Sequence, residues 1–223
     1  MGRHILFIAA LVAGLSYPLS PYLACREMLL PDWGPIAWKG AGVGLLAIWA
    51  SSQGRTTDHR LLAAVLLFGA VADMVLDVQF MMGAVIFAVG HGIAITLYLR
   101  NRRPALGRRD MALAALFIGG TILLGSRLAS PEMALPVGVY TLFLAVMAAT
   151  ALLSRFQVAA AGALLFLLSD LLIFARMGSL SGSGWVSPVI WLCYFAGQAL
   201  IAWGVASRIG PDAAFLDFRR SRR

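Results

Sequence analysis

Long apolar runs alternate with short polar segments along the whole chain. A helix that spans a membrane needs about 20 mostly apolar residues. Eight segments approach this length and composition, and they are residues 4–23, 35–51, 60–78, 80–99, 110–127, 133–153, 156–176 and 186–207. Residues 77–80 form a tight turn between the third and fourth segments, and the other connections are also short. The pattern predicts an all-α polytopic membrane bundle of eight transmembrane helices.

The overall composition supports a chain that is solvated by lipid. Of its 223 residues, 61% are hydrophobic and only 13% are charged, and the mean hydropathy is +0.85. A soluble domain usually carries about 25% charged residues. We therefore expect a multi-pass integral membrane protein in which residues 1–223 form one domain.

The basic residues are distributed unevenly between the two sets of connections, and this predicts the orientation. Most arginines lie in the connections on the side of the two termini, or in the basic tail at 210–223, whereas the opposite set holds only Arg26, Arg127 and Arg176. Cytoplasmic loops carry the excess of Lys and Arg. Both termini are therefore expected in the cytoplasm, as in a bacterial inner membrane. The net charge of +8 sits in loops and tail, which argues against nucleic acid. The tail could bind anionic membrane lipid, with a positive-inside anchor in solvent as the favoured alternative.

The two halves of the chain, about 1–103 and 104–209, resemble each other. Leu66-Leu67-Phe68 precedes Asp73, and Leu164-Leu165-Phe166 precedes Asp170. Four spans separate the two copies, so both would point the same way across the membrane. This predicts two parallel four-helix repeats related by an axis along the membrane normal, with a chance similarity between apolar helices as the alternative.

Asp73 and Asp170 lie deep inside apolar segments. A carboxylate in hydrocarbon is costly unless it is compensated, so an intramembrane acid is by default a candidate functional residue. At about 1.5 Å per residue, both acids lie roughly 20 Å into a core about 30 Å thick. We expect them to face each other in one polar site near the outer leaflet.

Other polar residues fall at a similar depth on neighbouring segments, and they are Lys39, His91, Tyr140 and Gln198. Tyr194 shares a helix face with Gln198, and Ser169 precedes Asp170. Each also has a structural interpretation. Asp73 could form an ion pair with Lys39, His91 could be a core histidine, and the tyrosines and Gln198 could be structural hydrogen-bonding residues. Asp77, one turn beyond Asp73, is expected to be solvated at the helix end.

Two carboxylates in a dry cavity suit acid–base chemistry. Desolvation and mutual repulsion favour one protonated and one ionised member, and Lys39 or His91 could stabilise the ionised one. A zinc hydrolase needs about three ligands, often histidines, and here only His91 is deep. No GxSxG motif of a serine hydrolase is present. The sequence therefore predicts metal-independent acid–base catalysis by Asp73 and Asp170, with no cofactor.

At these positions the sequence resembles the lysoplasmalogenase (YhhN-type) family of eight-helix membrane proteins. The features that carry the resemblance are Trp38-Lys39-Gly40, Asp73-Met74-Val75-Leu76, Gly83, Phe87, Gly90-His91, Tyr140, Gly162-Ala163, Phe166, Ser169-Asp170, Tyr194 and Gln198. One departure is Ala72, where the family usually has glycine before the aspartate. The resemblance implies hydrolysis of the vinyl ether bond of a lysoplasmalogen, a lysophospholipid, with Lys39, His91, Tyr140, Ser169, Tyr194 and Gln198 supporting the two acids.

Two other functions fit the same residues. Parallel repeats and midplane carboxylates also occur in lipid or proton-coupled small-molecule transporters. A hydrolase that prefers another lysophospholipid bond, such as an ester, would use the same acids. Aldehyde production separates the first alternative from the vinyl ether hydrolase, and a substrate panel separates the second.

Overall fold

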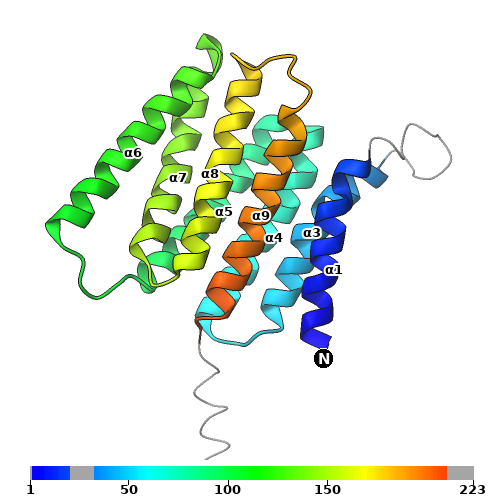
Figure 1. Cartoon of the computed structure of the whole chain (residues 1–223), viewed down its shortest axis with the longest axis vertical. Helices are drawn as coiled ribbons and strands as arrows, with labels where there is room; N and C mark the ends of the chain where they lie inside the picture. Colours follow the sequence, from blue (N-terminus) through cyan, green and yellow to red (C-terminus); the bar gives the residue numbers. More distant parts are fainter. Residues whose placement is uncertain (1, 21–32, 210–223) are drawn as a thin grey trace, which may run out of the picture.

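The computed structural model describes residues 2–20 and 33–209, and this part of the chain is almost entirely helical (Figure 1). It contains eight α-helices, which are α1 (Gly2–Ser16), α3 (Gly34–Ser51), α4 (Thr57–Val78), α5 (Phe80–Arg100), α6 (Arg108–Leu128), α7 (Ala134–Leu153), α8 (Gln157–Met177) and α9 (Val186–Ala206). Two 3-10 turns, η1 (Tyr17–Leu19) and η2 (Pro131–Met133), extend α1 and precede α7. The basic tail at 210–223 and Arg26 lie outside the described residues.

Six of the described helices are long and apolar enough to cross a membrane, and they are α4, α5, α6, α7 with η2, α8 and α9. The chain is therefore a multi-pass membrane protein. The helix α1 with η1 forms a shorter apolar segment over His4–Leu19. The helix α3 has 18 residues, and its four glycines and Lys39 lower its hydropathy.

The helices run from one end of the bundle to the other, so the connections collect at two ends (Figure 1). The basic end holds the start of α1 and the connections 52–56, 101–107 and 154–156. The distal end holds Gln79, 129–133 and 178–185. At the basic end Asp58 accepts hydrogen bonds from Arg100 Nε at 2.9 Å and Asn101 Nδ2 at 2.9 Å, which tie the start of α4 to the end of α5.

A connection of a single residue joins α4 to α5 at the distal end. Gln79 is extended, with φ −148° and ψ 102°, and its backbone N–H donates to Val75 O at 2.7 Å. The helix therefore stops at Val78 and restarts at Phe80 in the opposite direction. This tight reversal, which the sequence predicted, places the last turns of α4 beside the first turns of α5.

The helices α8 and α9 pack backbone against backbone through two glycines. A Cβ atom built on Gly162 would lie 2.6 Å from Gly197 O, and one built on Gly197 would lie 2.7 Å from Gly162 O. Only a residue without a Cβ fits at either position. The close approach lies on the basic-end side of Asp170 in α8 and of Tyr194 in α9, and it fixes the two helices against each other.

Candidate functional site

A cavity of about 350 Å³ opens at the distal end of the bundle. It lies between the last turns of α4 and α8 and the first turns of α5, α7 and α9, with η1 and α3 at its side. Pockets that bind small molecules measure about 300–1,000 Å³ and are mostly apolar with a few polar groups. This cavity fits that description, because most of its walls are apolar or aromatic while both predicted aspartates line it.

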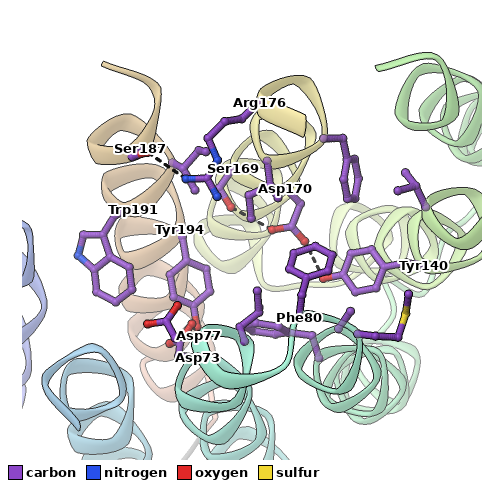
Figure 2. Close-up of a pocket in the computed structure, with 18 of the residues that line it drawn as sticks. Asp73, Asp77, Phe80, Tyr140, Ser169, Asp170, Arg176, Ser187, Trp191 and Tyr194 are labelled. Carbon is purple, nitrogen blue, oxygen red and sulfur yellow. Dashed lines mark hydrogen bonds between the residues drawn. The ribbon is translucent and has the colours of Figure 1, made fainter. Parts of the chain in front are cut away.

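Asp170 is held in the wall of the cavity by hydroxyl groups. Its side chain is buried, and Oδ2 accepts a hydrogen bond of 2.7 Å from Tyr140 Oη (Figure 2). The single hydroxyl hydrogen of Ser169 is shared between the backbone oxygen of Phe166, at 2.7 Å from Oγ, and Asp170 Oδ1, at 3.3 Å. Asp170 therefore has polar partners but forms no ion pair among the described residues.

Asp73 has an equivalent environment on α4. It is 3% exposed, and its Oδ2 accepts a hydrogen bond of 2.7 Å from Tyr194 Oη on α9. Gln198, one turn further along α9, donates from Nε2 to the same hydroxyl oxygen at 3.1 Å. Asp73 and Asp170 thus line one cavity, as the sequence predicted, and each receives a tyrosine hydroxyl from a neighbouring helix.

The two tyrosines connect the carboxylates to polar residues behind the cavity wall. His91 Nε2 lies 3.2 Å from Tyr140 Oη. Tyr140 has one hydroxyl hydrogen, and when Tyr140 donates it to an ionised Asp170, His91 Nε2 is the donor to Tyr140 Oη. Two matching chains result, His91–Tyr140–Asp170 and Gln198–Tyr194–Asp73. His91 and Gln198 do not line the main cavity but share a small void of about 10 Å³ behind it.

Lys39 contacts Asp77 and not Asp73, which the sequence had offered as its possible partner. Its Nζ forms an ion pair with Asp77 Oδ1 and not with Asp73. Asp77 lies one helical turn closer to the distal end than Asp73, and Lys39 lies near the distal start of α3. Asp77 is exposed near the end of α4, as the sequence predicted, and the ion pair with Lys39 is an additional contact that the sequence did not predict. The spacing of four residues from Asp73 already placed Asp77 on the same helix face.

Aromatic side chains pack around Tyr194 at the cavity wall. The Phe87 and Tyr194 rings meet edge to face with centroids 5.8 Å apart, and the Trp191 and Tyr194 rings are 5.5 Å apart. Phe166 packs edge to face on Tyr194 at 5.1 Å. These contacts fix the tyrosine ring and hence the direction of its bond to Asp73. The sequence showed no signal for Trp191, which is one of several apolar aromatic residues in its helix.

Two further polar residues at the cavity mouth were not predicted from the sequence. Arg176, in the last turn of α8, donates from Nη1 to Ser187 Oγ of α9 at 2.9 Å. Both residues line the cavity. Within the residues that the structure describes, no three His, Cys, Asp or Glu side chains form a group that could hold a metal ion.

The chain is similar to known proteins over most of its length. The model of the YhhN family matches residues 35–205. Two relatives, each named lysoplasmalogenase, come from Mycobacterium bovis and Mycobacterium tuberculosis. Each is 28% identical over 223 aligned positions, which cover 91% of this chain and 84% of the relative. No solved structure matches the chain significantly.

Proposed function

Because the chain belongs to the YhhN family, we propose that it is a membrane-embedded hydrolase that cleaves the vinyl ether bond of lysoplasmalogens. The products would be a fatty aldehyde and a glycerophospho-head group. The observation that carries this proposal is the pair Asp73 and Asp170, which line one largely apolar cavity and whose hydrogen-bond donors among the described residues are all neutral. The name of the mycobacterial relatives supports the same reaction.

The reaction needs one proton donor and one proton acceptor. A protonated aspartate transfers its proton to the β-carbon of the vinyl ether, which leaves an oxocarbenium ion. The ionised aspartate stabilises this cation and takes a proton from the water that adds to the α-carbon. The hemiacetal then collapses as the aspartate that protonated the β-carbon, now ionised, removes the hemiacetal hydroxyl proton and the bond between the α-carbon and the ether oxygen breaks. The aspartate that took the proton from water gives it to that oxygen, which leaves as the glycerol hydroxyl, and both carboxyl groups return to their starting states. Either of the two aspartates can take either role.

The surroundings of the acids suit this chemistry. Like charges in an apolar site favour one neutral and one ionised carboxyl group. Lys39 forms its ion pair with Asp77, so it does not directly neutralise Asp73 or Asp170. The tyrosine hydroxyls can stabilise an ionised carboxylate, and the apolar walls can accept the hydrocarbon chain beside the vinyl ether. Ser169, His91 and Gln198 would support the site by orienting Asp170 and the two tyrosines.

The proposal includes the arrangement in the membrane. All eight helices would span the bilayer as two parallel four-helix repeats, about 1–103 and 104–209, with both termini in the cytoplasm. In Figure 1 the arginine-rich connections lie at the same end as the start of α1. The cavity opens at the opposite end, so the positive-inside rule places it toward the outer leaflet of a bacterial inner membrane.

Aldehyde release by the purified protein tests the reaction itself. The protein in detergent or nanodiscs should release a fatty aldehyde from 1-alkenyl lysophospholipid. It should release much less product from matched 1-alkyl and 1-acyl lipids. A transporter of the same fold would release no aldehyde, and an ester hydrolase would release fatty acid from the acyl substrate. Either result would contradict the proposal.

Chelation should leave the activity unchanged. The proposed acid and base are side chains of the protein, so incubation with EDTA followed by desalting is expected to retain the initial rate of aldehyde release. A zinc hydrolase assayed in parallel provides the positive control. Loss of most of the activity, with recovery on adding zinc, would show that a metal takes part.

Removal of each tyrosine hydroxyl should reveal which aspartate is ionised. Tyr140→Phe removes the donor to Asp170, and Tyr194→Phe removes the donor to Asp73. A hydrogen bond to a charged group contributes about 1.5–3 kcal/mol, more than one to a neutral group. The variant that faces the ionised aspartate is expected to lose about tenfold or more in kcat. The other variant should lose less.

Steady-state rates of aldehyde release measure the effect of both variants. Tyr98→Phe serves as the control because it removes a buried tyrosine hydroxyl that does not line the cavity. Equal, small losses in all three variants would contradict the proposed roles.

A further inference from the structure

Arg176 is a cation at the mouth of the cavity, and it has no acidic partner among the described residues. It is exposed, lines the cavity and donates from Nη1 to the neutral hydroxyl of Ser187 at 2.9 Å. Among the described residues the ion pairs are Lys39–Asp77 and Arg100–Asp58, so Arg176 takes part in neither. A guanidinium carries five N–H donors, and the bond to Ser187 uses one of them.

The charges around the cavity are therefore arranged unevenly. On one side Lys39 is neutralised by Asp77. At the level of Tyr140 and Tyr194, the two proposed catalytic acids are held by hydroxyl groups. At the rim of α8 and α9, Arg176 presents a positive charge that no acid in the described part of the chain compensates. A ligand with one anionic group will place that group at Arg176 and away from the aspartates.

The spacing along α8 matches the covalent length of a glycerophospholipid head group. Arg176 lies six residues beyond Asp170, which corresponds to roughly 9 Å along the helix axis. In a lysoplasmalogen, one glycerol unit separates the vinyl ether oxygen from the phosphate. A lipid whose vinyl ether lies beside the aspartates would thus hold its phosphate near the last turn of α8.

We propose that Arg176 and Ser187 form the phosphate-binding site for the lysophospholipid substrate, an inference that rests on the proposed function. Arg176 offers its remaining N–H donors to the phosphate oxygens, as guanidinium groups commonly do. Ser187 Oγ accepts from Arg176 and keeps its own hydrogen to donate to the same phosphate. The site selects phosphate-bearing lipids over neutral glycerol ethers and orients the lipid with its chain directed away from the rim.

A structural role for Arg176 makes a different prediction. A cation in the last turn of a helix interacts favourably with the helix dipole. Arg127 has the same position in α6, is also exposed, and lies outside the cavity lining. Arg127→Gln is thus a matched control, because it removes a last-turn charge from the same end of the bundle without touching the cavity.

Two substrates that differ only in the phosphate test the assignment. With 1-alkenyl lysophosphatidylethanolamine, Arg176→Gln is expected to raise KM by about 10-fold to 100-fold. With 1-alkenylglycerol, which has no phosphate, KM should stay within about twofold of the unaltered protein. Arg176→Lys should fall between, and Arg127→Gln should change neither value. An equal effect of Arg176→Gln on both substrates, or none on either, would overturn the phosphate site.

A binding measurement separates this inference from the proposed reaction. A radiolabelled 1-alkyl lysophospholipid carries the same phosphate but has no vinyl ether to hydrolyse. Its Kd for the protein in nanodiscs should rise with Arg176→Gln, whereas the Kd of 1-alkylglycerol should not. This result would support the phosphate site even if no aldehyde were released, and its absence would reject the site even if aldehyde release were normal. Inorganic phosphate should not displace the lipid, and displacement would assign Arg176 to free phosphate instead.

Discussion

Asp73→Asn and Asp170→Asn are each expected to reduce aldehyde release by about 10²-fold to 10⁴-fold, the usual contribution of a positioned acid–base group. Asparagine preserves the shape of the side chain and can still accept the tyrosine hydrogen bond. It can neither donate a carboxyl proton nor act as a base. The loss should therefore appear in kcat, while the protein elutes as a single folded species in detergent.

The double variant distinguishes a cooperating pair from two independent residues. If the acids act in one reaction, combining the two substitutions should cost little more than either alone, because residues that act as a unit are not additive. Asp110→Asn is the control, since Asp110 accepts a hydrogen bond from Gly107 N at the start of α6 and lies at the basic end, away from the cavity. Near-normal activity of either single variant would contradict the proposed mechanism.

Gly197→Val should abolish both correct packing and activity. A Cβ at Gly197 would lie 2.7 Å from Gly162 O and 3.0 Å from Phe166 N, so α9 must move away from α8. Overpacking of a close interface typically costs about 1–3 kcal/mol or more, and here the obstructing atoms belong to backbone that cannot rotate aside. Because Tyr194 and Trp191 reach the cavity from α9, its displacement would also break the bond to Asp73.

Thermal unfolding in detergent, followed by intrinsic fluorescence, measures the packing effect, and aldehyde release measures the effect on the site. Gly92→Val provides the matched control, because a Cβ at Gly92 in α5 has no heavy atom within 4 Å. It introduces the same side chain into another apolar helix. A Gly197→Val protein with the Tm and activity of the control would show that the contact between α8 and α9 is not required.

The helices were predictable because in a membrane the apolar length of a segment decides its structure. Backbone polar groups must be satisfied within the segment when no water is available, so each long apolar run has to be a helix. The predicted range 80–99 compares with Phe80–Arg100 in the structure, and 186–207 with Val186–Ala206. The first helix was predicted to run to residue 23, and the structure describes α1 over Gly2–Ser16 followed by η1.

The candidate acids were also predictable, because a carboxylate inside an apolar helix is conspicuous. The hydrogen-bond and ion-pair partners of those acids could not be predicted from the sequence. The sequence offered Lys39 as a possible ion-pair partner of Asp73. In the structure Lys39 pairs with Asp77, and Asp73 receives its hydrogen bond from Tyr194 on α9. The environment of Asp73 therefore depends on α9, a helix of the other half of the chain.

The sequence by itself determined the helical architecture, the membrane-embedded character and the positions of Asp73 and Asp170 along their helices, because these follow from hydrophobic length and from the rise of a helix. Only the tertiary structure decided which tyrosine hydroxyl donates to which aspartate, that Lys39 forms an ion pair with Asp77, and that Arg176 lies at the cavity mouth. The physical reason is that a helix fixes the height of a side chain, whereas its contacts depend on how each helix is rotated and packed against helices distant in sequence.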